Sequence, residues 1–408
     1  MKKTVAVFFG SKSYEHDVSI MTGLEAYFNI DTTRYDPIPV YIDIEGNWWT
    51  GKELLEKRNY PLSDSTKKKL GQATFVVSGK KPFIRVKKGL FSTKDVYFDC
   101  ALLAFHGDFG EDGPFQGLFE TAGIPYTGTR IMASSVFMNK YLTKTILRGA
   151  DIPVLDGIFI PHPKTENFDV SSLIKDLKLK FPVIVKPNAL GSSIGLTKAK
   201  NREETEAGLL KIFAMGADAL IEECVLNLEE FNVSVTRCLT GETQTSAIER
   251  PKTVDPDEIL DFTQKYLGGT GKCGAKKCPA KVSGLKTAGL KVGSKTGGLL
   301  AMTRDLNPKD LSKTESANIR SWATKAFDIL QGTGVVRIDF MCDTKTRKFY
   351  LNEVNTIPGS LSFYLWAGAN PVVLYPELLT GLIEEAFEQH KLRHGRSVKL
   401  TESKIFGR

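Results

Sequence analysis

The sequence predicts an α/β fold (α+β overall), in which an N-terminal domain built on a parallel sheet precedes further sheet-containing domains. Two observations carry this prediction. Over roughly the first 130 residues, apolar strands alternate with segments of helical spacing, which is typical of a parallel sheet covered on both faces. The length of 408 residues exceeds one ordinary core, so two or three domains are expected.

The N-terminal elements follow from hydrophobic periodicity and from the glycines that end each strand. Ligands of parallel sheets bind beyond the strand ends, so residues 10–15 and 106–113 are the predicted ligand-binding loops. The predicted strands here are residues 4–10, 35–43 and 98–107, with a hairpin over residues 74–86.

Later segments alternate in the same way. One helix is predicted over residues 133–150, ending near Gly149, and another begins at Asn201, which forms a capping pair with Glu204. The other predicted strands are residues 156–161, 181–187, 194–200, 218–225, 229–239, 334–343 and 348–359, with helices over about 309–331 and 376–392.

Charge and composition limit the function classes. Much of the net charge of +8 comes from residues 268–298, which hold nine glycines, seven lysines and no acidic residue. That segment has no aromatic residue for base stacking, so a basic flap meeting a small anionic ligand fits at least as well as nucleic-acid binding. No apolar run reaches the ~18–20 residues that span a bilayer.

The N-terminus and the cysteines indicate a cytoplasmic protein. The apolar run at residues 5–9 is shorter than the roughly 7–15 residues of a signal peptide. The six cysteines are scattered, so we interpret them as reduced thiols. A zinc site at Cys273 and Cys278 is disfavoured, because zinc sites take four ligands at tighter spacing.

The stretch "KPNALGSSIG" (186–195) predicts a phosphate-binding loop of an unusual kind. Its lysine precedes the glycines, and the following residues, "IGLTKAK", are strand-like. A Walker or Rossmann loop leads directly into a helix whose N-terminus holds the phosphate. This loop joins two strands instead, which favours a mobile flap that lays backbone N–H groups over phosphates, with Lys186 at its base.

Two predicted strands near the C-terminus carry candidate metal ligands. Asp339 lies two residues from Arg337, so both share one face of a strand, and Glu353 and Asn355 share a face in the same way. Two carboxylates and an amide form an oxygen-only site that suits Mg²⁺ held against nucleotide phosphates. The alternative is an Arg–Asp surface ladder, but strands this apolar make stray charges costly.

Three further residues are candidates on weaker grounds. Lys186 lies at a strand end beside the glycine loop, whereas Lys140 alone is more typical of a solvated lysine. His106 ends a buried strand and enters a Gly-Asp-Glu loop, where a functional role and a structural one are equally expected.

Together these motifs resemble the ATP-grasp superfamily and, within it, the D-alanine–D-alanine ligase family. The resemblance runs through nearly the whole chain in order. The most specific segments are "HGDFGEDGPFQG" (106–117) and "LNEVNTIPG" (351–359). The others are "GSKSYEHDVS" (10–19), "MNKYLTK" (138–144), "FPVIVKPNALGSSIG" (181–195), "LIEECV…EEF" (220–231), "KY…CPA" (265–280) and "VVRIDFM" (335–341).

The resemblance implies an N-terminal domain followed by a two-part ATP-grasp fold, with ATP between the last two domains. The implied limits are residues 1–138, 139–226 and 227–396, with a tail at 397–408. It implies ATP and two Mg²⁺ (or Mn²⁺) ions, small-molecule substrates, no nucleic-acid or membrane partner, and allows a homodimer.

The resemblance also implies a role for each site residue. Lys140 and Lys186 contact the α- and β-phosphates, with Ser193 in the closing loop. Glu15 takes the ammonium of the first amino acid, and Ser192 and Tyr266 join Glu15 in a hydrogen-bonded group that closes two flaps. The other implied roles are Glu222 and Glu223 at the adenine, Glu230 at the ribose, Asp339, Glu353 and Asn355 at the metals, Arg337 and the Gly359 N–H at the charged intermediate, and His106 near the substrates.

The implied activity is ATP-dependent ligation of two D-alanines for peptidoglycan precursor synthesis. Two departures from the family bear on it. Gly10-Ser11 replaces Gly-Gly, and Phe363 and Tyr364 stand where the family has a Ser-His-Ser segment that helps to hold the second substrate's carboxylate. These aromatic residues are therefore expected at the second substrate. They leave open another acceptor, such as D-serine or another amino acid. A non-catalytic nucleotide-binding protein is a more distant alternative.

Overall fold

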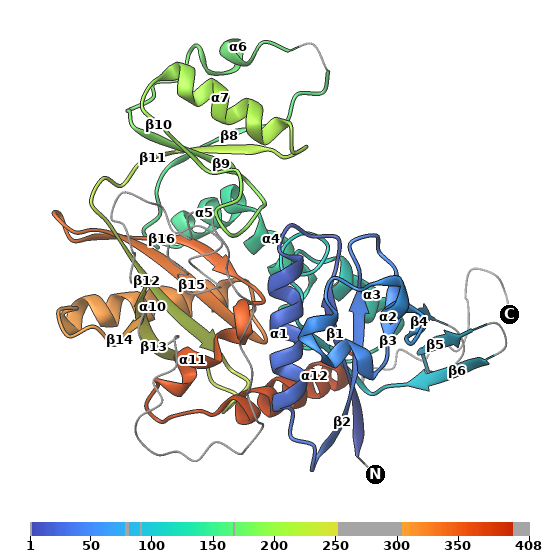
Figure 1. Cartoon of the computed structure of the whole chain (residues 1–408). Coiled ribbons are helices and arrows are strands. Elements are labelled where there is room, and N and C mark those ends of the chain that lie inside the picture. Colours follow the sequence, from blue (N-terminus) through green and yellow to red (C-terminus); the bar gives the residue numbers. More distant parts are fainter. Residues whose placement is uncertain (1, 78–80, 90–91, 166–167, 252–303, 395–408) are drawn as a thin grey trace, which may run out of the picture.

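The computed structural model describes residues 2–77, 81–89, 92–165, 168–251 and 304–394. Within these residues the chain forms three sheets, one after another along the sequence (Figure 1). Tyr266, Cys273, Cys278, the segment 281–302 and the tail 397–408 lie outside the described residues. In the part of the chain that is described, no helix is both long and apolar enough to cross a membrane.

The first sheet consists of seven strands: β1 (Lys3–Gly10), β2 (Tyr35–Ile42), β3 (Trp48–Thr50), β4 (Gly71–Val76), β5 (Phe83–Lys88), β6 (Ser92–Tyr97) and β7 (Cys100–Leu103). Their order is β6-β5-β4-β3-β2-β1-β7. β1 pairs in parallel with β2 and β7, as predicted, and β3 to β6 extend this core as an antiparallel meander. The predicted hairpin is the β4–β5 pair.

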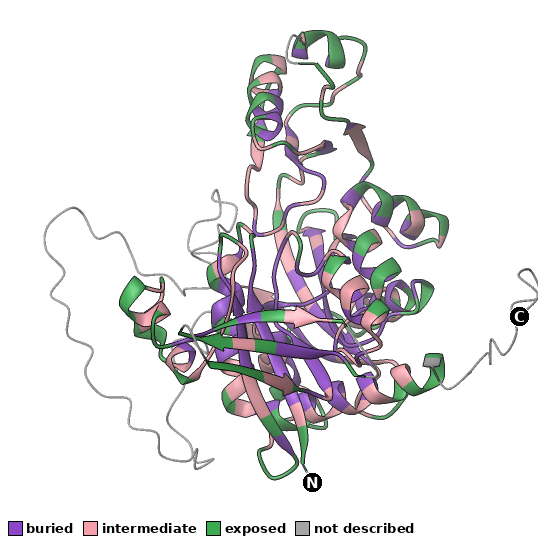
Figure 2. Ribbon diagram, turned by 90° about the vertical axis from the view of Figure 1, so that its right-hand side faces the viewer, coloured by how far each residue is buried: buried purple, intermediate pink, exposed green. Residues whose placement is uncertain are grey.

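The first sheet is covered on both faces because successive side chains of β1 point in opposite directions. Phe8 meets Phe119 of α3 (Pro114–Ala122), with 4.9 Å between the ring centroids. On the other face Phe9 lies against α1 (His16–Asn29), where a side chain at Gly23 would collide with the Phe9 ring. The last described helix, α12 (Tyr375–His394), adds leucines to the same core as β1. Buried residues, purple in Figure 2, gather along the strands in the interior.

The second sheet has four antiparallel strands in the order β10-β9-β11-β8: β8 (Gly157–Ile160), β9 (Val183–Pro187), β10 (Thr197–Ala199) and β11 (Ala219–Glu223). Two helices, α6 (Val170–Ile174) and α7 (Arg202–Phe213), pack on it. The glycine loop joins β9 to β10, which confirms a strand-to-strand connection. Asn201 caps α7 as predicted, because its side chain accepts from the Glu204 N–H at 2.9 Å.

The third sheet has five antiparallel strands in the order β14-β13-β12-β15-β16: β12 (Leu228–Thr236), β13 (Gln244–Pro251), β14 (Arg304–Leu306), β15 (Val335–Asp343) and β16 (Lys348–Asn355). α10 (Lys313–Ile329) covers one face, where Val233 and Ile338 join Ile319 in a buried cluster. A short 3-10 helix (359–362) and α11 (Phe363–Ala367) follow β16. Along β12 and β15 apolar residues alternate with polar ones, so the opposite face is polar.

The single helix predicted over residues 133–150 is wrong. The chain forms two helices, α4 (Ile131–Met138) and α5 (Lys140–Gly149), separated at Asn139. The Asn139 backbone is extended, and its side chain accepts from the Leu142 N–H at 2.9 Å. Asparagine at a cap stabilises a new helix start, which periodicity alone does not reveal. Lys140 therefore becomes the first residue of α5.

Candidate active site

A row of polar side chains crosses four strands on the polar face of the third sheet. Pairing places Glu353 of β16 opposite Asp339 of β15, and Asp339 opposite Asn232 of β12. Asn232 in turn lies opposite Glu249 of β13. Directly paired residues point to the same face of a sheet, so these four side chains adjoin one another. The sequence predicted the first two, but it gave no register from which Asn232 and Glu249 could be found.

Asp339 is the most heavily bonded member of the row. Arg337 donates to it through two nitrogens, each at 2.7 Å, and the Asn355 amide donates to its Oδ2 at 3.1 Å. The structure thus brings Arg337, Asp339, Glu353 and Asn355 together on one face. Among the described residues, no group of three or more His, Cys, Asp or Glu side chains forms a metal site. Two carboxylates and an amide are the relevant donors here.

Buried lysines lie beside this face. Lys186 of β9 donates to the side-chain oxygen of Asn352 in β16 at 3.1 Å and pairs with Glu222 of β11 at 2.5 Å. Lys140 lies 3.8 Å from Glu353 and donates to the Leu190 carbonyl at 2.5 Å. These contacts join the second and third sheets, and each of the two lysines lies against a carboxylate.

Lys144 is a site residue that the sequence reasoning missed. It is buried and pairs with the other oxygen of Glu222, so this carboxylate lies between two lysines. Burial raises the pKa of Glu222, but the two lysines, Lys144 and Lys186, together lower it by more. The pKa of Glu222 therefore lies below its usual range. Burial lowers the pKa of Lys144 to about 8. The available signal was spacing, because Lys144 lies one helical turn after Lys140.

The glycine loop reaches the N-terminal domain through Glu15. The Ser192 hydroxyl donates to the Glu15 carboxylate, and both residues are buried. A side chain at Gly191 would lie 2.6 Å from that carboxylate, so only glycine permits this approach. Ser192 and Ser193 both have positive φ, which is strained for residues other than glycine. The structure therefore brings Glu15 and Ser192 together, as the sequence predicts.

His106 is buried and joins two loops. Its Nε2 lies 2.8 Å from the Thr22 hydroxyl oxygen, which accepts from the Ser360 N–H at 3.0 Å. Burial lowers the pKa of His106 to about 3, so the ring is neutral at physiological pH. These contacts position the segment after β16, and a role of His106 at the substrates stays a prediction.

Glu111 makes a second link between the same loops and was also missed. Its carboxylate accepts from the Gly107 N–H at 2.8 Å and from the Ile357 N–H at 3.2 Å. Burial, reinforced by Glu15, raises its pKa. The acidic residue inside "HGDFGEDG" was the signal.

The remaining predicted residues differ in burial and in what they contact. Glu223 is exposed, Glu230 is half-buried and Gly359 is buried. Phe363 stacks on Tyr375 of α12, with 4.4 Å between centroids, and so faces the core. Tyr364 instead faces Arg304, whose guanidinium lies 4.0 Å from its ring centroid. Of the two aromatic candidates, only Tyr364 adjoins the polar face.

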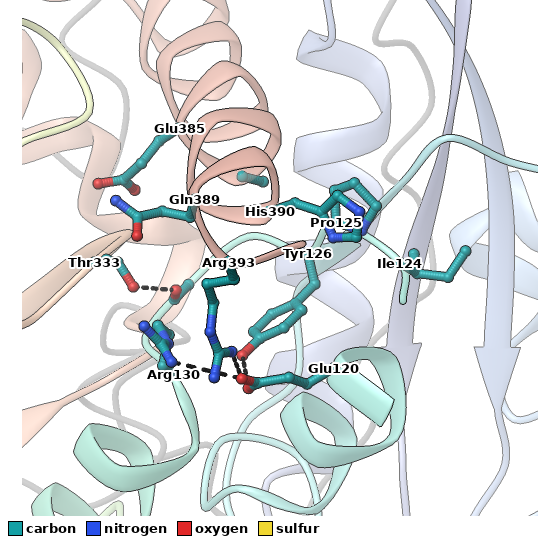
Figure 3. Close-up of a pocket in the computed structure, with 12 residues that line it drawn as sticks. Glu120, Ile124, Pro125, Tyr126, Arg130, Thr333, Glu385, Gln389, His390 and Arg393 are labelled. Carbon is teal, nitrogen blue, oxygen red and sulfur yellow. Dashed lines mark hydrogen bonds and ion pairs between the residues drawn. The ribbon is translucent and has the colours of Figure 1, made fainter. Parts of the chain in front are cut away.

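A separate pocket lies between α3, residues 124–130 and α12 (Figure 3). The Tyr126 hydroxyl donates to Glu120 at 2.9 Å on one side. On the other, Glu385 accepts from the Gly334 N–H at 2.6 Å, while its Oε1 has no partner among the described residues. Burial raises the pKa of Glu385 to about 7. None of the site residues named above lines this pocket.

Comparison with solved structures defines the class of fold. A D-alanine–D-alanine ligase structure from Coxiella burnetii has a TM-score of 0.73 and 22% identity, covering 97% of this chain and 96% of that one. A VanG D-Ala:D-Ser ligase from Enterococcus faecalis has a TM-score of 0.72 and 23% identity, covering 95% and 100%. At these identities the likeness shows the fold, which is the ATP-grasp fold.

Sequence comparison defines the family. A model of the D-Ala D-Ala ligase N-terminus matches residues 4–129, and one of the C-terminus matches residues 146–293 and 302–384. A D-alanine–D-alanine ligase of Thermosipho melanesiensis is 32% identical over 388 residues, 95% of this chain and 94% of the relative. One of Clostridium acetobutylicum is 32% identical over 395 residues, 95% and 98%. The chain belongs to the D-alanine–D-alanine ligase family, whose members are ATP-dependent ligases.

Proposed function

We propose that this protein joins two D-alanines into D-alanyl-D-alanine, with consumption of ATP, for peptidoglycan precursor synthesis. One observation carries the proposal. Lys140 and Lys186 lie against Glu353 and Asn352, beside Asp339, where the second sheet meets the third. Phosphoryl transfer requires positive charge around the ATP phosphates, because negative charge develops on them during the transfer. Lysine side chains supply part of that charge, and oxygen ligands can hold metal ions that supply the rest.

Nucleotide binding is assigned to the same meeting point. Lys140 and Lys186 contact the phosphates, and Glu222 is held between Lys144 and Lys186. Glu223 and Glu230 lie at the end of β11 and on β12 and are assigned to the adenine and the ribose. Ser193 belongs to the loop that closes over the phosphates.

The donor set fits Mg²⁺ or Mn²⁺. Asp339 and Glu353 face each other across adjacent strands, and Asn355 touches Asp339, so hard oxygen ligands converge. We assign two ions to these three residues. Mg²⁺ held there neutralises negative charge on the ATP phosphates.

The chemistry follows from the substrates. A carboxylate is a poor electrophile, so the γ-phosphoryl group of ATP is transferred to the carboxylate oxygen of the first D-alanine, giving an acyl phosphate and ADP. The neutral amine of the second D-alanine then attacks the carbonyl carbon. A bond forms between this nitrogen and the carbonyl carbon. The bond between the carbonyl carbon and the phosphate oxygen then breaks, and inorganic phosphate leaves while the nitrogen loses one proton. Arg337 and the Gly359 N–H stabilise the oxyanion that forms between these events.

Two loops exclude water from the acyl phosphate. Glu15 binds the ammonium of the first D-alanine, and the Ser192–Glu15 hydrogen bond fixes the closed glycine loop. Tyr266 is assigned to the second loop. Closure matters because water hydrolyses an acyl phosphate before the amine reaches it.

A different second substrate is the alternative function. Tyr364 packs against Arg304 at the position where the family's serine-containing segment helps to hold the acceptor's carboxylate. D-serine or another small amino acid, bound as the second substrate, would contact the same Tyr364 side chain.

Several coarser assignments accompany the proposal. The three sheets correspond to domains over residues 1–138, 139–226 and 227–396. The protein acts on small molecules in the cytoplasm, where ATP is supplied, and a homodimer is its proposed assembly.

Phosphate release tests the proposal directly. Purified protein is incubated with ATP, Mg²⁺ and single or paired amino acids, and both phosphate and dipeptide are measured. D-alanine alone is expected to give D-alanyl-D-alanine with one phosphate released for each dipeptide, and L-alanine to give neither. Turnover with D-alanine plus D-serine, without turnover on D-alanine alone, would transfer the proposal to the alternative.

A further inference from the structure

Glu249 is a fully buried carboxylate at the far end of the polar row, and no step proposed above uses it. The Asn232 amide donates to its Oε2 at 3.2 Å, and Arg304 of β14 pairs with its other oxygen. A buried carboxylate is costly unless it is paired and hydrogen-bonded. Glu249 meets both conditions and thereby fixes the place of Arg304.

Arg304 is held on a second side by Tyr364. The guanidinium carbon lies 4.0 Å from the centroid of the Tyr364 ring, which is the geometry of a cation–π contact. Burial raises the pKa of Tyr364, Glu249 raises it further, and Arg337 and Arg304 oppose them. Along the polar row, Asn232 lies between Glu249, the partner of Arg304, and Asp339, the partner of Arg337. Arg304 and Arg337 therefore adjoin the same polar face of the third sheet.

The Arg304 side chain retains an unused donor. Its Nη1 bonds Glu249, whereas its Nε is buried and has no hydrogen-bond partner among the described residues. A buried N–H without a partner is costly, so a group that accepts from it is expected. The side chain is 20% exposed, so a small molecule can reach it.

The second substrate supplies a suitable acceptor. An amino acid whose amine attacks the acyl phosphate still carries a carboxylate, and this charge needs a cation. Lys186 is assigned to the phosphates and Arg337 to the oxyanion, so Arg304 is a cation that these assignments leave for the carboxylate. Prior pairing with Glu249 does not prevent Arg304 from binding another carboxylate.

The same sheet shows one guanidinium serving several carboxylates. Arg250, the neighbour of Glu249, pairs with Glu229, Asp305 and Asp310 at distances of 2.6 to 3.1 Å. A planar guanidinium with five N–H donors permits this arrangement.

We propose that Arg304, fixed by Glu249 and Tyr364, binds the carboxylate of the second amino acid and thereby selects acceptors that carry one. The inference rests on the proposed ligase function. It assigns to Arg304 the task for which the family uses a Ser-His-Ser segment, where this chain has Phe363 and Tyr364.

Competition between two acceptors tests the inference. The enzyme is given ATP and a fixed mixture of D-alanine and D-alaninamide, and D-alanyl-D-alanine and D-alanyl-D-alaninamide are quantified by mass spectrometry. The product ratio does not depend on how much enzyme is active, because both products come from the same molecules. Arg304→Gln is expected to lower the ratio of dipeptide to dipeptide amide by about 10- to 100-fold, the value of a charged hydrogen bond.

Two matched variants sharpen the result. Arg250→Gln removes the adjacent arginine of the third sheet and is expected to leave the ratio unchanged. Arg304→Lys keeps the charge without the fork and is expected to lower the ratio less than Arg304→Gln. If the glutamine variant fails to fold, the ratio measured with Arg304→Lys tests the inference in its place. An unchanged ratio in a folded Arg304 variant overturns the inference.

A partial reaction separates this inference from the proposed function. With hydroxylamine in large excess over D-alanine as the competing acceptor, the acyl phosphate is trapped as D-alanine hydroxamate. Arg304→Gln is expected to form hydroxamate at no less than the wild-type rate, since Arg304 is assigned to the second amino acid alone. If wild-type protein forms neither hydroxamate nor dipeptide, the ligase function itself fails. If hydroxamate formation is lost in Arg304→Gln but not in Arg250→Gln, Arg304 acts on the first step and the inference fails.

Discussion

The polar row of the third sheet ends at Glu353 on one side and at Glu249 on the other, and the charged groups that adjoin these two ends are balanced differently. We call the side next to the buried lysines the phosphate end and the side next to Arg304 the acceptor end. At the phosphate end, Lys186, Glu222 and Lys144 form a buried chain in which every carboxylate oxygen of Glu222 meets a lysine. At the acceptor end, Arg304 keeps a buried donor with no partner among the described residues. The phosphate end is thus internally neutralised before ATP arrives, whereas the acceptor end is left incomplete for a ligand. Substitutions at the two ends should therefore fail differently.

The largest expected effect is at the phosphate end. Asp339→Asn removes a carboxylate of the proposed metal site and leaves Arg337 without its bidentate partner, so hydroxamate formation should fall by about 10³-fold or more. Asp156→Asn, at a side chain that is 94% exposed, is the control and should keep full activity. Retention of more than a tenth of the rate in Asp339→Asn would remove Asp339 from the metal site.

Lys144→Met tests whether the phosphate end is neutralised as a unit. It leaves Glu222 with one lysine, so the free energy of unfolding should fall by about 3 kcal/mol, measured by urea denaturation. Because the two residues are coupled, Lys144→Met combined with Glu222→Gln should be more stable than Lys144→Met alone. Simple additivity of the two losses would show that the pair is not coupled.

Ser192→Ala separates loop closure from charge balance. It removes the hydrogen bond to Glu15 but no charge, so kcat should fall by about tenfold and the protein should remain equally stable. More of the acyl phosphate should also be lost to water, seen as phosphate released in excess of dipeptide. Ser65→Ala, at an exposed serine of the first domain, is the matched control. A phosphate-to-dipeptide ratio that stays at one argues against closure through Ser192.

The smallest expected effect is away from both ends, in the pocket of Figure 3. The pKa of Glu385 rises from 4.5 to about 7 on folding, so the folded state binds the extra proton and stability falls as pH rises through this window. Glu385→Gln should gain stability relative to wild type by about 1 to 3 kcal/mol between pH 5 and pH 8. Exposed Glu242→Gln should show no such trend. Turnover should be unchanged in both variants.

Local patterns predicted the phosphate end well. Asp339, Glu353 and Asn355 lie on adjacent strands, as the short connection between the two strands indicated. The strand-like pattern after the glycine loop correctly predicted that this loop joins two strands. The acceptor end was not predictable. Glu249 and Arg304 are 55 residues apart and meet only through pairing of β13 and β14, and register between distant strands leaves no trace in local periodicity. The helix break at Asn139 was missed for a related reason. Apolar spacing continues across Asn139, so periodicity predicts one helix although the asparagine side chain caps a second one.

Because a new helix begins after Asn139, its first backbone amides can report by hydrogen exchange on the segment that leads into the glycine loop. The Lys140 N–H donates to the Asn188 carbonyl at 2.9 Å, and the Tyr141 N–H donates to the Asn188 side chain at 2.9 Å. Amides in the first turn of a helix lack partners within the helix and ordinarily exchange fast. Here two of them are protected by the segment that leads into the loop. Their exchange rates therefore record how long that segment stays docked, at backbone positions next to the lysine assigned to the phosphates.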